Sequence, residues 1–273
     1  MLELPETITL GKQIQQSLTG KVVRRVLPPT KPHKFTWFAG DPADYDARMR
    51  DCSVSGGAGF GSNAELVLDN GLKLSFSDGA NPRLLTIATL PKDYQLAIEF
   101  TDDTALCVTV AMYGGIVLHD STYDNPYYQK SLHTVSPLSG EFAAHYQKTL
   151  SQSKPTLSVK AFLATEQRFP GLGNGVLQDI LLEAGFHPKR KIGTLSAADH
   201  SRLLSAVTAS LTDMTARGGR DTEKDLFGNP GGYRTLLSKN TLPFGCPKCG
   251  GVIVKEAYLG GAVYYCPACQ PIE

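Results

Sequence analysis

The chain has 273 residues, 41% of them hydrophobic, which is enough for about two domains with buried cores. No apolar run reaches the roughly 18 residues that a membrane helix needs and no signal peptide is visible, so we expect a soluble, intracellular protein without a membrane partner. The net charge of +1 divides into −4 over residues 1–129 and +5 over residues 130–273, which weakly favours a polyanionic partner for the second half, although a solvated basic surface also explains it.

The N-terminal part predicts one helix followed by β-structure. Residues 3–20 are predicted to be helical, because Pro5 suits a first turn and Gly20 is a C-terminal stop. Short apolar or alternating runs follow, with Asp69-Asn70-Gly71 as a hairpin turn. The predicted strands are 22–26, 65–68, 72–76, 84–89, 95–100 and 106–111. This order indicates a β-sandwich or barrel capped by one helix.

The middle of the chain changes to helical periodicity. Residues 119–137 are rich in turn-forming residues and predict a linker, and helices are predicted at 139–150, 157–164, 174–184 and 196–217. The last helix begins at a capping box formed by Ser196 and Asp199. The segment Pro170-Gly-Leu-Gly-Asn-Gly175 leads into the third helix, where free backbone N–H groups suit a phosphate. A tight turn with positive φ is the simpler interpretation, and we favour it.

The C-terminal end carries a metal-binding pattern. Cys246-Pro-Lys-Cys249 and Cys266-Pro-Ala-Cys269 are separated by 16 residues, a spacing typical of a four-cysteine zinc site. Residues 252–254 and 263–265, with a Gly260-Gly261 turn, predict a β-hairpin between the pairs. Because four thiolates leave no open coordination position, we predict one structural Zn²⁺ without a catalytic role. Cys52 and Cys107 are predicted to be buried thiols, as in a reducing compartment.

Three segments together resemble the formamidopyrimidine-DNA glycosylase / endonuclease VIII family. They are Met1-Leu-Glu-Leu-Pro-Glu6, then Phe169-Pro-Gly-Leu-Gly-Asn-Gly175 leading to Glu183-Ala-Gly-Phe-His-Pro188, and the cysteine ribbon ending at Gln270. The resemblance implies an α+β fold with an N-terminal β-sandwich (1–125), a helix–two-turn–helix DNA-binding domain (136–235) and a zinc finger (240–273). It also implies a monomer that binds damaged double-stranded DNA between its halves, in the cytoplasm and on the nucleoid when bound.

The resemblance implies a catalytic centre at the N-terminus. In the family, removal of the initiator Met exposes a Pro whose amine attacks the sugar C1′ and forms a Schiff base, assisted by an adjacent Glu. Here Glu3 and Glu6 stand at the two carboxylate positions, but Leu2 replaces the Pro. A bulky Leu2 is expected to leave Met1 in place, which puts the free amine one residue, about 3.8 Å of chain, too early. We therefore predict impaired lyase chemistry, with Met1 as nucleophile only if its amine is repositioned. The first-turn carboxylate of Glu3 also has a structural interpretation, since a helix dipole favours it.

The positions that the resemblance assigns to DNA contacts on strands and finger are mostly changed. Ser62 stands in place of a phosphate-binding Lys, and Gly261 in place of the finger's Arg. Ser77-Asp78-Gly79 replaces the motif with the void-filling Met. Ala111-Met112-Tyr113-Gly114 replaces the motif with the void-filling Arg and aromatic, so Met112 and Tyr113 are the remaining candidates for a wedge in the base stack.

The DNA-binding positions of the helical domain are better matched. The resemblance assigns a phosphate contact to Lys160 and a grip on the DNA backbone to Gly173 and Asn174. The structural alternatives are a solvated lysine and a helix N-cap. The loop 221–233 is expected to be a lid over the lesion pocket.

Phe35 and Trp37, beside Lys31, His33 and Lys34, form a second candidate for nucleic-acid contact, as a stacking patch. Burial of the two aromatics is the favoured interpretation. Two functions therefore remain open: a base-excision DNA glycosylase with impaired or altered lyase chemistry, and a catalytically inactive protein that recognises lesions or distorted DNA on the same scaffold.

Overall fold

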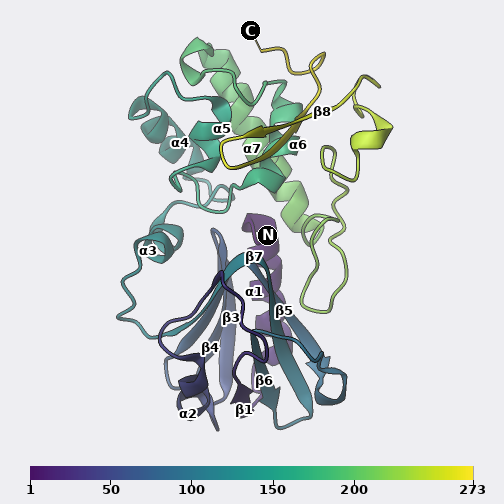
Figure 1. Ribbon diagram of the computed structural model, residues 1–273. Coiled ribbons are helices and arrows are strands. Elements are labelled where there is room, and N and C mark those ends of the chain that lie inside the picture. The colour runs from purple at the N-terminus through teal and green to yellow at the C-terminus, as the bar shows by residue number, and fades with distance from the viewer. Residues whose placement is uncertain (273) are drawn as a thin grey trace.

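The computed structural model describes residues 1–272 and has an α+β fold. Figure 1 shows a sheet-rich N-terminal part below, a helical part above with the β8–β9 hairpin across it, and α3 between the two. The N-terminus of the chain lies at the junction of the two parts. The predicted fold class is confirmed.

The N-terminal part is one hydrogen-bonded sheet that folds over on itself. Its strands run in the order β1-β6-β7-β5-β4-β3, with β2 pairing in parallel with β7. Residues from both ends of this order, such as Val26 and Val54, share one core with Ile14 of α1. The elements are α1 (Leu4–Leu18), β1 (Val23–Leu27), β2 (Thr36–Trp37), α2 (Tyr45–Met49), β3 (Val54–Phe60), β4 (Asn63–Leu68), β5 (Lys73–Thr86), β6 (Leu96–Phe100) and β7 (Thr104–His119), with 3₁₀ turns at Pro42–Asp44 and Ile87–Thr89.

Strand β3 was not among the predicted strands, because its glycines gave no alternation to detect. The same glycines bring α1 against the sheet: a Cβ at Gly57 or Gly59 would collide with the backbone of α1, and one at Gly11 with the backbone of β3. These glycines weaken the strand, because they have low β-propensity and no side chain to pack, but they allow α1, the helix that carries the N-terminal segment, to pack closely on it.

Two further predictions about the elements were wrong. The predicted strands 72–76 and 84–89 are parts of one long strand, β5, which ends at Thr86 and pairs with β7 through a bulge between Asp78 and Ala80, while 87–89 form a 3₁₀ turn. The predicted linker contains a helix, α3 (Pro126–His133), whose N-cap is the side chain of Asn125. Pro126 at the first helical position looked like a linker residue but suits a helix start.

The helical part agrees closely with its predicted periodicity. Its helices are α4 (Phe142–Ser151), α5 (Val159–Ala164), α6 (Asn174–Ala184) and α7 (Ala197–Ala216), with 3₁₀ turns at Ile192–Thr194 and Leu242–Phe244. The capping box of Ser196 and Asp199 is present. These helices enclose a second core that includes Phe162 and Phe169. No helix among residues 1–272 is both long and apolar enough to span a membrane.

The C-terminal hairpin, β8 (Val254–Tyr258) and β9 (Gly261–Tyr265), packs on α6. The Gln178 side chain on α6 donates to the carbonyl of Ala262 at 3.1 Å and accepts from the Tyr264 N–H at 3.0 Å. The fully buried Gln270 joins the Cys266 N–H to the Phe186 carbonyl. The hairpin therefore takes its position from α6. Cys107 is buried as predicted, whereas Cys52 is only half-buried.

Asp179 on α6 makes the free energy of unfolding depend on pH. Its buried carboxylate accepts the N–H groups of Leu236 and Leu237 at 2.9 and 2.8 Å, and burial raises its pKa to about 6. Because this folded-state pKa exceeds the unfolded value, the group favours folding most at low pH, and its contribution is lost as pH rises through about 6. We expect the stability of the native chain relative to Asp179→Asn to fall between about pH 4 and about pH 6, measured as urea midpoints. A constant difference across this range would contradict the assignment.

Candidate functional site

The N-terminal segment is fixed at the junction of the two parts. The Met1 ammonium donates to Glu223 Oε2 at 2.7 Å, and the Leu2 N–H donates to the carbonyl of Asp78. The Leu2 side chain is buried in the core of the sheet. The residue that stands in the nucleophile position is thus an ordinary peptide unit, and the free amine lies one residue away in an ion pair.

Glu3 supplies the anion for the N-terminus of α6. Its two carboxylate oxygens accept the N–H groups of Gly175 and Val176 at 2.8 and 2.7 Å. A helix N-terminus binds anions through such free N–H groups and its dipole. The glycine-rich turn therefore binds a carboxylate of this chain at two of the N–H groups that a phosphate would need. A Cβ at Gly173 would collide with that carboxylate, which explains the glycine at the N-cap.

Arg220 lies between the acidic side chains of the N-terminal segment. Its guanidinium donates to Glu6 Oε1 at 3.0 Å and to Glu6 Oε2 at 2.8 Å, and it lies 3.5 Å from Glu3. All three side chains are buried. Burial lowers the pKa of Arg220, but Glu3 and Glu6 outweigh it and raise the pKa above its usual value. Burial raises the pKa of Glu3, opposed by Arg220 and the α6 N–H groups.

The loop 218–233, which contains the predicted lid 221–233, joins α7 to contacts with the sheet-rich part. Its Leu226 is fully buried in the N-terminal core, where its carbonyl accepts the Leu84 N–H. Gln13 on α1 donates to Asp225 at 2.9 Å and accepts from the Leu226 N–H at 2.9 Å. Figure 1 shows this loop descending from α7 beside the sheet. Arg220 and Glu223 are carried by the same loop, so it also fixes the N-terminal ion pairs.

Met112 and Tyr113, the two wedge candidates, lie on β7 where its pairing with β5 is interrupted by a bulge. Asp78 and Met112 both have positive φ, 56° and 66°, next to the bulge in β5. Bulges of this kind bend a strand and redirect its side chains. Met112 is largely exposed, and the Tyr113 ring contacts Trp37 edge-on at 6.0 Å between centroids. Contrary to the expectation that they are buried, Phe35 and Trp37 are 50% and 52% exposed.

Lys160 has a contact within the chain in this structure. It is 1% exposed, and its ammonium donates to the carbonyl of Tyr258 at the tip of β8. Burial lowers its pKa. The side chain therefore ties α5 to the hairpin, which is neither the phosphate contact nor the solvated lysine considered from the sequence. A role in binding phosphate stays a prediction that requires this contact to break.

Asn174, the first residue of α6, faces the hairpin at Gly261. A Cβ at Gly261 would collide with the Asn174 amide, so the absence of a side chain there makes room for it. The two positions that the family resemblance assigned to DNA contacts are thus adjacent. Asn174 remains half-exposed, whereas Gly261 offers no side chain at all.

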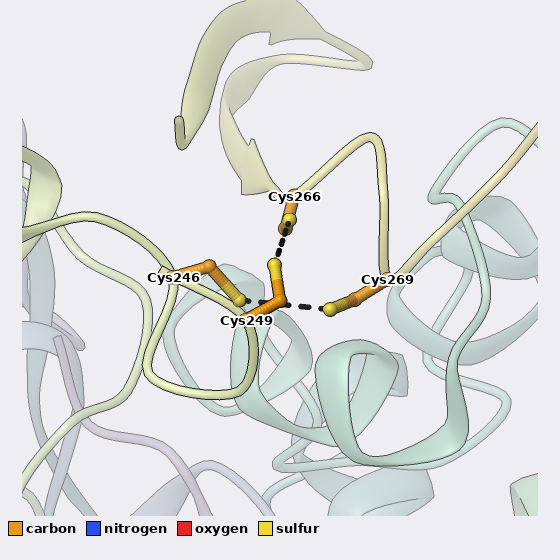
Figure 2. Close-up of side chains that lie close together, drawn as sticks. All are labelled: Cys246, Cys249, Cys266 and Cys269. Atoms are coloured by element: carbon orange, nitrogen blue, oxygen red, sulfur yellow. Dashed lines mark hydrogen bonds between the residues drawn. The ribbon is translucent and has the colours of Figure 1, made fainter. Parts of the chain in front are cut away.

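The four cysteines converge as a metal site would require (Figure 2). Their Sγ atoms all lie within 4.8 Å of one another, with Cys246–Cys269 at 3.8 Å and Cys249–Cys266 at 3.5 Å. Four sulfurs around a tetrahedral ion with bonds of about 2.3 Å are expected about 3.8 Å apart. The turn at Gly250 (φ 72°) directs the Gly251 N–H at Cys249 Sγ, 3.4 Å away. The donor set fits a metal ion.

Only part of one ion-pair cluster was predictable from the sequence; its members are Met1, Glu3, Glu6, Arg220 and Glu223. The two glutamates were recognised through the family resemblance. Arg220 and Glu223 lie more than 200 residues away, in a loop where no periodicity identifies a partner. The signal that was available is the glycine pair preceding Arg220: Gly218 and Gly219 have φ of 75° and 95° and turn the chain back toward α1.

Known proteins that resemble this chain in sequence and in fold carry the same name, as the following comparisons show. No family model matches the chain. Proteins named formamidopyrimidine-DNA glycosylase from Mycolicibacterium gilvum and Acidothermus cellulolyticus are 25% and 26% identical to it over 284 and 285 residues, covering 99% and 100% of this chain and 99% and 98% of theirs. A solved complex of the Lactococcus lactis Fpg with DNA containing an abasic site has a TM-score of 0.82 at 19% identity, covering 98% of this chain and 99% of that one.

Proposed function

Because the chain is a homologue of proteins named formamidopyrimidine-DNA glycosylase over nearly its full length and shares their fold, we propose that it binds damaged duplex DNA as a base-excision repair protein with impaired lyase chemistry. The solved structures with this fold include Fpg complexes with DNA that carries an abasic site or a damaged purine. The observation that carries the chemical part of the proposal is the ion pair of the Met1 amine with Glu223.

The placement of the N-terminal segment supports loss of the nucleophile. An amine attacks a sugar carbon only through a free lone pair, and here the ammonium is held by a carboxylate. Moving Met1 into the place of Leu2 would withdraw the Leu2 side chain from the core at a cost of about 2 kcal/mol. The same movement would pull Glu3 away from the N–H groups of Gly175 and Val176. These contacts oppose the repositioning that a Met1 nucleophile requires.

The state of the two carboxylates supports the second candidate function, a DNA-binding protein without turnover. A general acid or base must reach the reacting group through a free oxygen. Both oxygens of Glu3 accept backbone N–H groups, and both oxygens of Glu6 accept from Arg220. Neither carboxylate is available for proton transfer until this cluster rearranges. A catalytically inactive DNA-binding protein with this fold is therefore the alternative to a glycosylase with impaired lyase chemistry.

The cysteine cluster supports a structural zinc ion. Cys246, Cys249, Cys266 and Cys269 would hold it, and a closed thiolate site supplies folding free energy without chemistry. The cluster orders the hairpin against α6, beside Asn174. In the proposed complex this surface holds the DNA backbone.

Borohydride trapping on a duplex with an abasic site tests the chemical proposal. We expect adduct only at background level from the native chain with Met1 intact, and roughly a hundredfold more than this background for Leu2→Pro, whose trimmed chain offers a secondary amine at the family position. Leu2→Ile is the matched control, because it keeps a bulky residue and Met1. Intact mass establishes the N-terminus of each protein.

Binding and base release are measured on the same duplexes. Salt-dependent binding, tighter for damaged than for intact DNA, supports the DNA-binding proposal, and equal weak binding to both contradicts it. An adduct from the native chain with Met1 retained would show that the amine leaves Glu223 and would refute the loss of lyase chemistry. Base release without an adduct would identify a glycosylase that uses water and would rule out the inactive scaffold.

A further inference from the structure

Asp78 places a third carboxylate at the junction of the two parts. It lines a cavity of about 580 Å³ where β4, β5 and β7 meet α3 and the segment before α6. Asp78 is the one carboxylate among the described residues that line this cavity, and neither Glu3 nor Glu6 reaches it. Trp37, which lines the same cavity, is 52% exposed, so water can enter. The cavity therefore offers Asp78 a reaction space that the Glu3–Arg220 cluster does not fill.

Asp78 lies directly beside the N-terminal segment. Its carbonyl accepts the N–H of Leu2, the residue in the nucleophile position. Burial raises the pKa of the Asp78 carboxyl above its ordinary value, opposed by the Ser77 hydroxyl and the Met1 ammonium. Burial and then the Asp78 charge raise the pKa of Tyr113, so the Tyr113 hydroxyl shares the same space. A carboxyl with a raised pKa in a cavity is typical of groups that exchange protons.

The carboxylate of Asp78 has an oxygen to spare. Its Oδ2 accepts from the Ser77 hydroxyl at 3.1 Å, and no residue within 1–272 donates to its Oδ1. By contrast, both oxygens of Glu3 accept N–H groups of α6, and both oxygens of Glu6 accept from Arg220. A general base must reach the reacting group through a free oxygen. Of the three carboxylates, Asp78 meets this requirement without any rearrangement.

The backbone at Asp78 also has a purely structural interpretation. Its φ of 56° lies in the left-handed region, which aspartate adopts more readily than most residues. The following Gly79 admits no side chain, because a Cβ there would lie 2.0 Å from the carbonyl oxygen of Ala111. The bulge thus fixes the direction of the Asp78 side chain. If the backbone alone selects the residue, Asn or Gly should serve equally well at this position.

We propose that Asp78 is the general base of a base-release reaction that uses water as the nucleophile. The inference rests on the proposed function, which supplies a damaged nucleotide at the N-terminal segment. The Asp78 carboxylate takes a proton from a water molecule as the water oxygen forms a bond to the sugar C1′. The bond between C1′ and the base nitrogen breaks, and its electron pair leaves with the base. That nitrogen takes up a proton from solvent, and Asp78 later returns its own proton to solvent.

This reaction leaves the observed contacts of the N-terminal segment intact. The Met1 amine stays paired with Glu223, and Glu3 stays on the N–H groups of α6. No covalent link between the chain and the sugar forms. The proposal therefore predicts release of the base without a product that borohydride can trap.

Single-turnover base release by the full-length, zinc-loaded protein tests the proposal. The substrates are a duplex with one formamidopyrimidine guanine and a duplex with one oxidised guanine, and labelled DNA measures binding in parallel. We expect the native chain to release the base from at least one of them. Asp78→Asn should lower this rate about a hundredfold without weakening DNA binding, since it removes the base and keeps the shape of the side chain.

Two further variants separate the carboxylate from the backbone. Asp78→Gly also lacks the carboxylate but adopts the left-handed conformation without strain, so it carries the test if Asp78→Asn fails to fold. Added formate fits the space left in Asp78→Gly and should restore part of its rate. Asp51→Asn is the matched control, because Asp51 is an exposed aspartate with φ of 64°, and its rate should equal that of the native chain. Thermal unfolding confirms that each variant is folded.

The pH profile gives a readout that a backbone role would not change. The native rate should rise with pH as Asp78 ionises, and Asp78→Asn should lose this rise. The titratable groups that face Asp78 are the Met1 ammonium, which pairs with Glu223, and the Tyr113 hydroxyl, which also faces Glu3. Tyr113→Phe removes one of these groups and is expected to keep the rise.

The outcomes distinguish failure of this proposal from failure of the proposed function. Base release at the native rate in both Asp78 variants overturns the general base and leaves a glycosylase. Binding of damaged DNA without base release by the native chain also overturns it and leaves a DNA-binding protein without turnover. Absence of DNA binding overturns the proposed function as well. A rate that falls in both variants, with the rise in pH lost, supports the proposal.

Discussion

Arg220→Met is expected to destabilise the protein by about 3–5 kcal/mol, because it leaves Glu3 and Glu6 buried without their cation. In the variant nothing but the α6 N–H groups opposes the burial and the neighbouring Glu6 that raise the pKa of Glu3, because the cation that lowers this pKa is gone. The variant should therefore recover more of its stability than the native chain as pH falls. Urea unfolding between pH 4.5 and 7.5 measures both effects.

Two comparisons make this result specific to the buried cluster. Arg217→Met removes an exposed arginine that pairs with Asp213 at 2.7 Å, and we expect a change below about 1 kcal/mol. Adding Glu6→Gln to Arg220→Met removes one of the stranded charges and should restore part of the lost stability. Equal losses for the two arginine variants would show that the Arg220 cluster contributes no more than a surface ion pair.

Removal of the metal ion is expected to unfold the C-terminal hairpin while the rest of the chain stays folded. The core beneath the hairpin is small, with Leu182, Leu237 and Ile253 buried beside Cys246 and Cys266. So small a core does not hold a hairpin without a covalent or metal link, and in such sites metal binding supplies much of the folding free energy. Hydrogen exchange with and without a chelator should show protection lost across β8 and β9 alone.

Cys266→Ser should reproduce this loss, together with loss of the one bound zinc ion per chain that metal analysis is expected to find. Cys52→Ser, at a thiol outside the cluster, is the matched control and should change neither zinc content nor protection. If Asn174 acts with the hairpin on DNA, chelation also weakens DNA binding. Full protection of β9 after chelation would contradict a structural role for the metal ion.

Elements with a local signature were predictable from the sequence. Helix α6 begins and ends where its periodicity predicted, Ser196 and Asp199 cap α7 through contacts three residues apart, and the cysteine pairs converge as their spacing indicated. Each of these depends on neighbours in the chain. Local chemistry is therefore enough to specify them.

Features decided by distant contacts were not predictable. Strand β3 exists because glycines let α1 approach, and Lys160 is buried because Tyr258, 98 residues later, offers a carbonyl. The N–H groups of α6 bind Glu3, 172 and 173 residues away. The same reason explains why Phe35 and Trp37 were expected to be buried: a short apolar run does not reveal whether another segment covers it.

If the chain binds DNA as proposed, the burial of Leu226 in the N-terminal core would also limit the rate of association with DNA. Any widening of the angle between the two parts that draws the loop 218–233 away from the sheet must extract this side chain, at a cost of about 2 kcal/mol. Such a cost leaves the open state populated at about 3%. A duplex that requires the open state would then associate about thirtyfold more slowly than with a chain already open. Leu226 would act as a latch whose release governs how fast DNA enters.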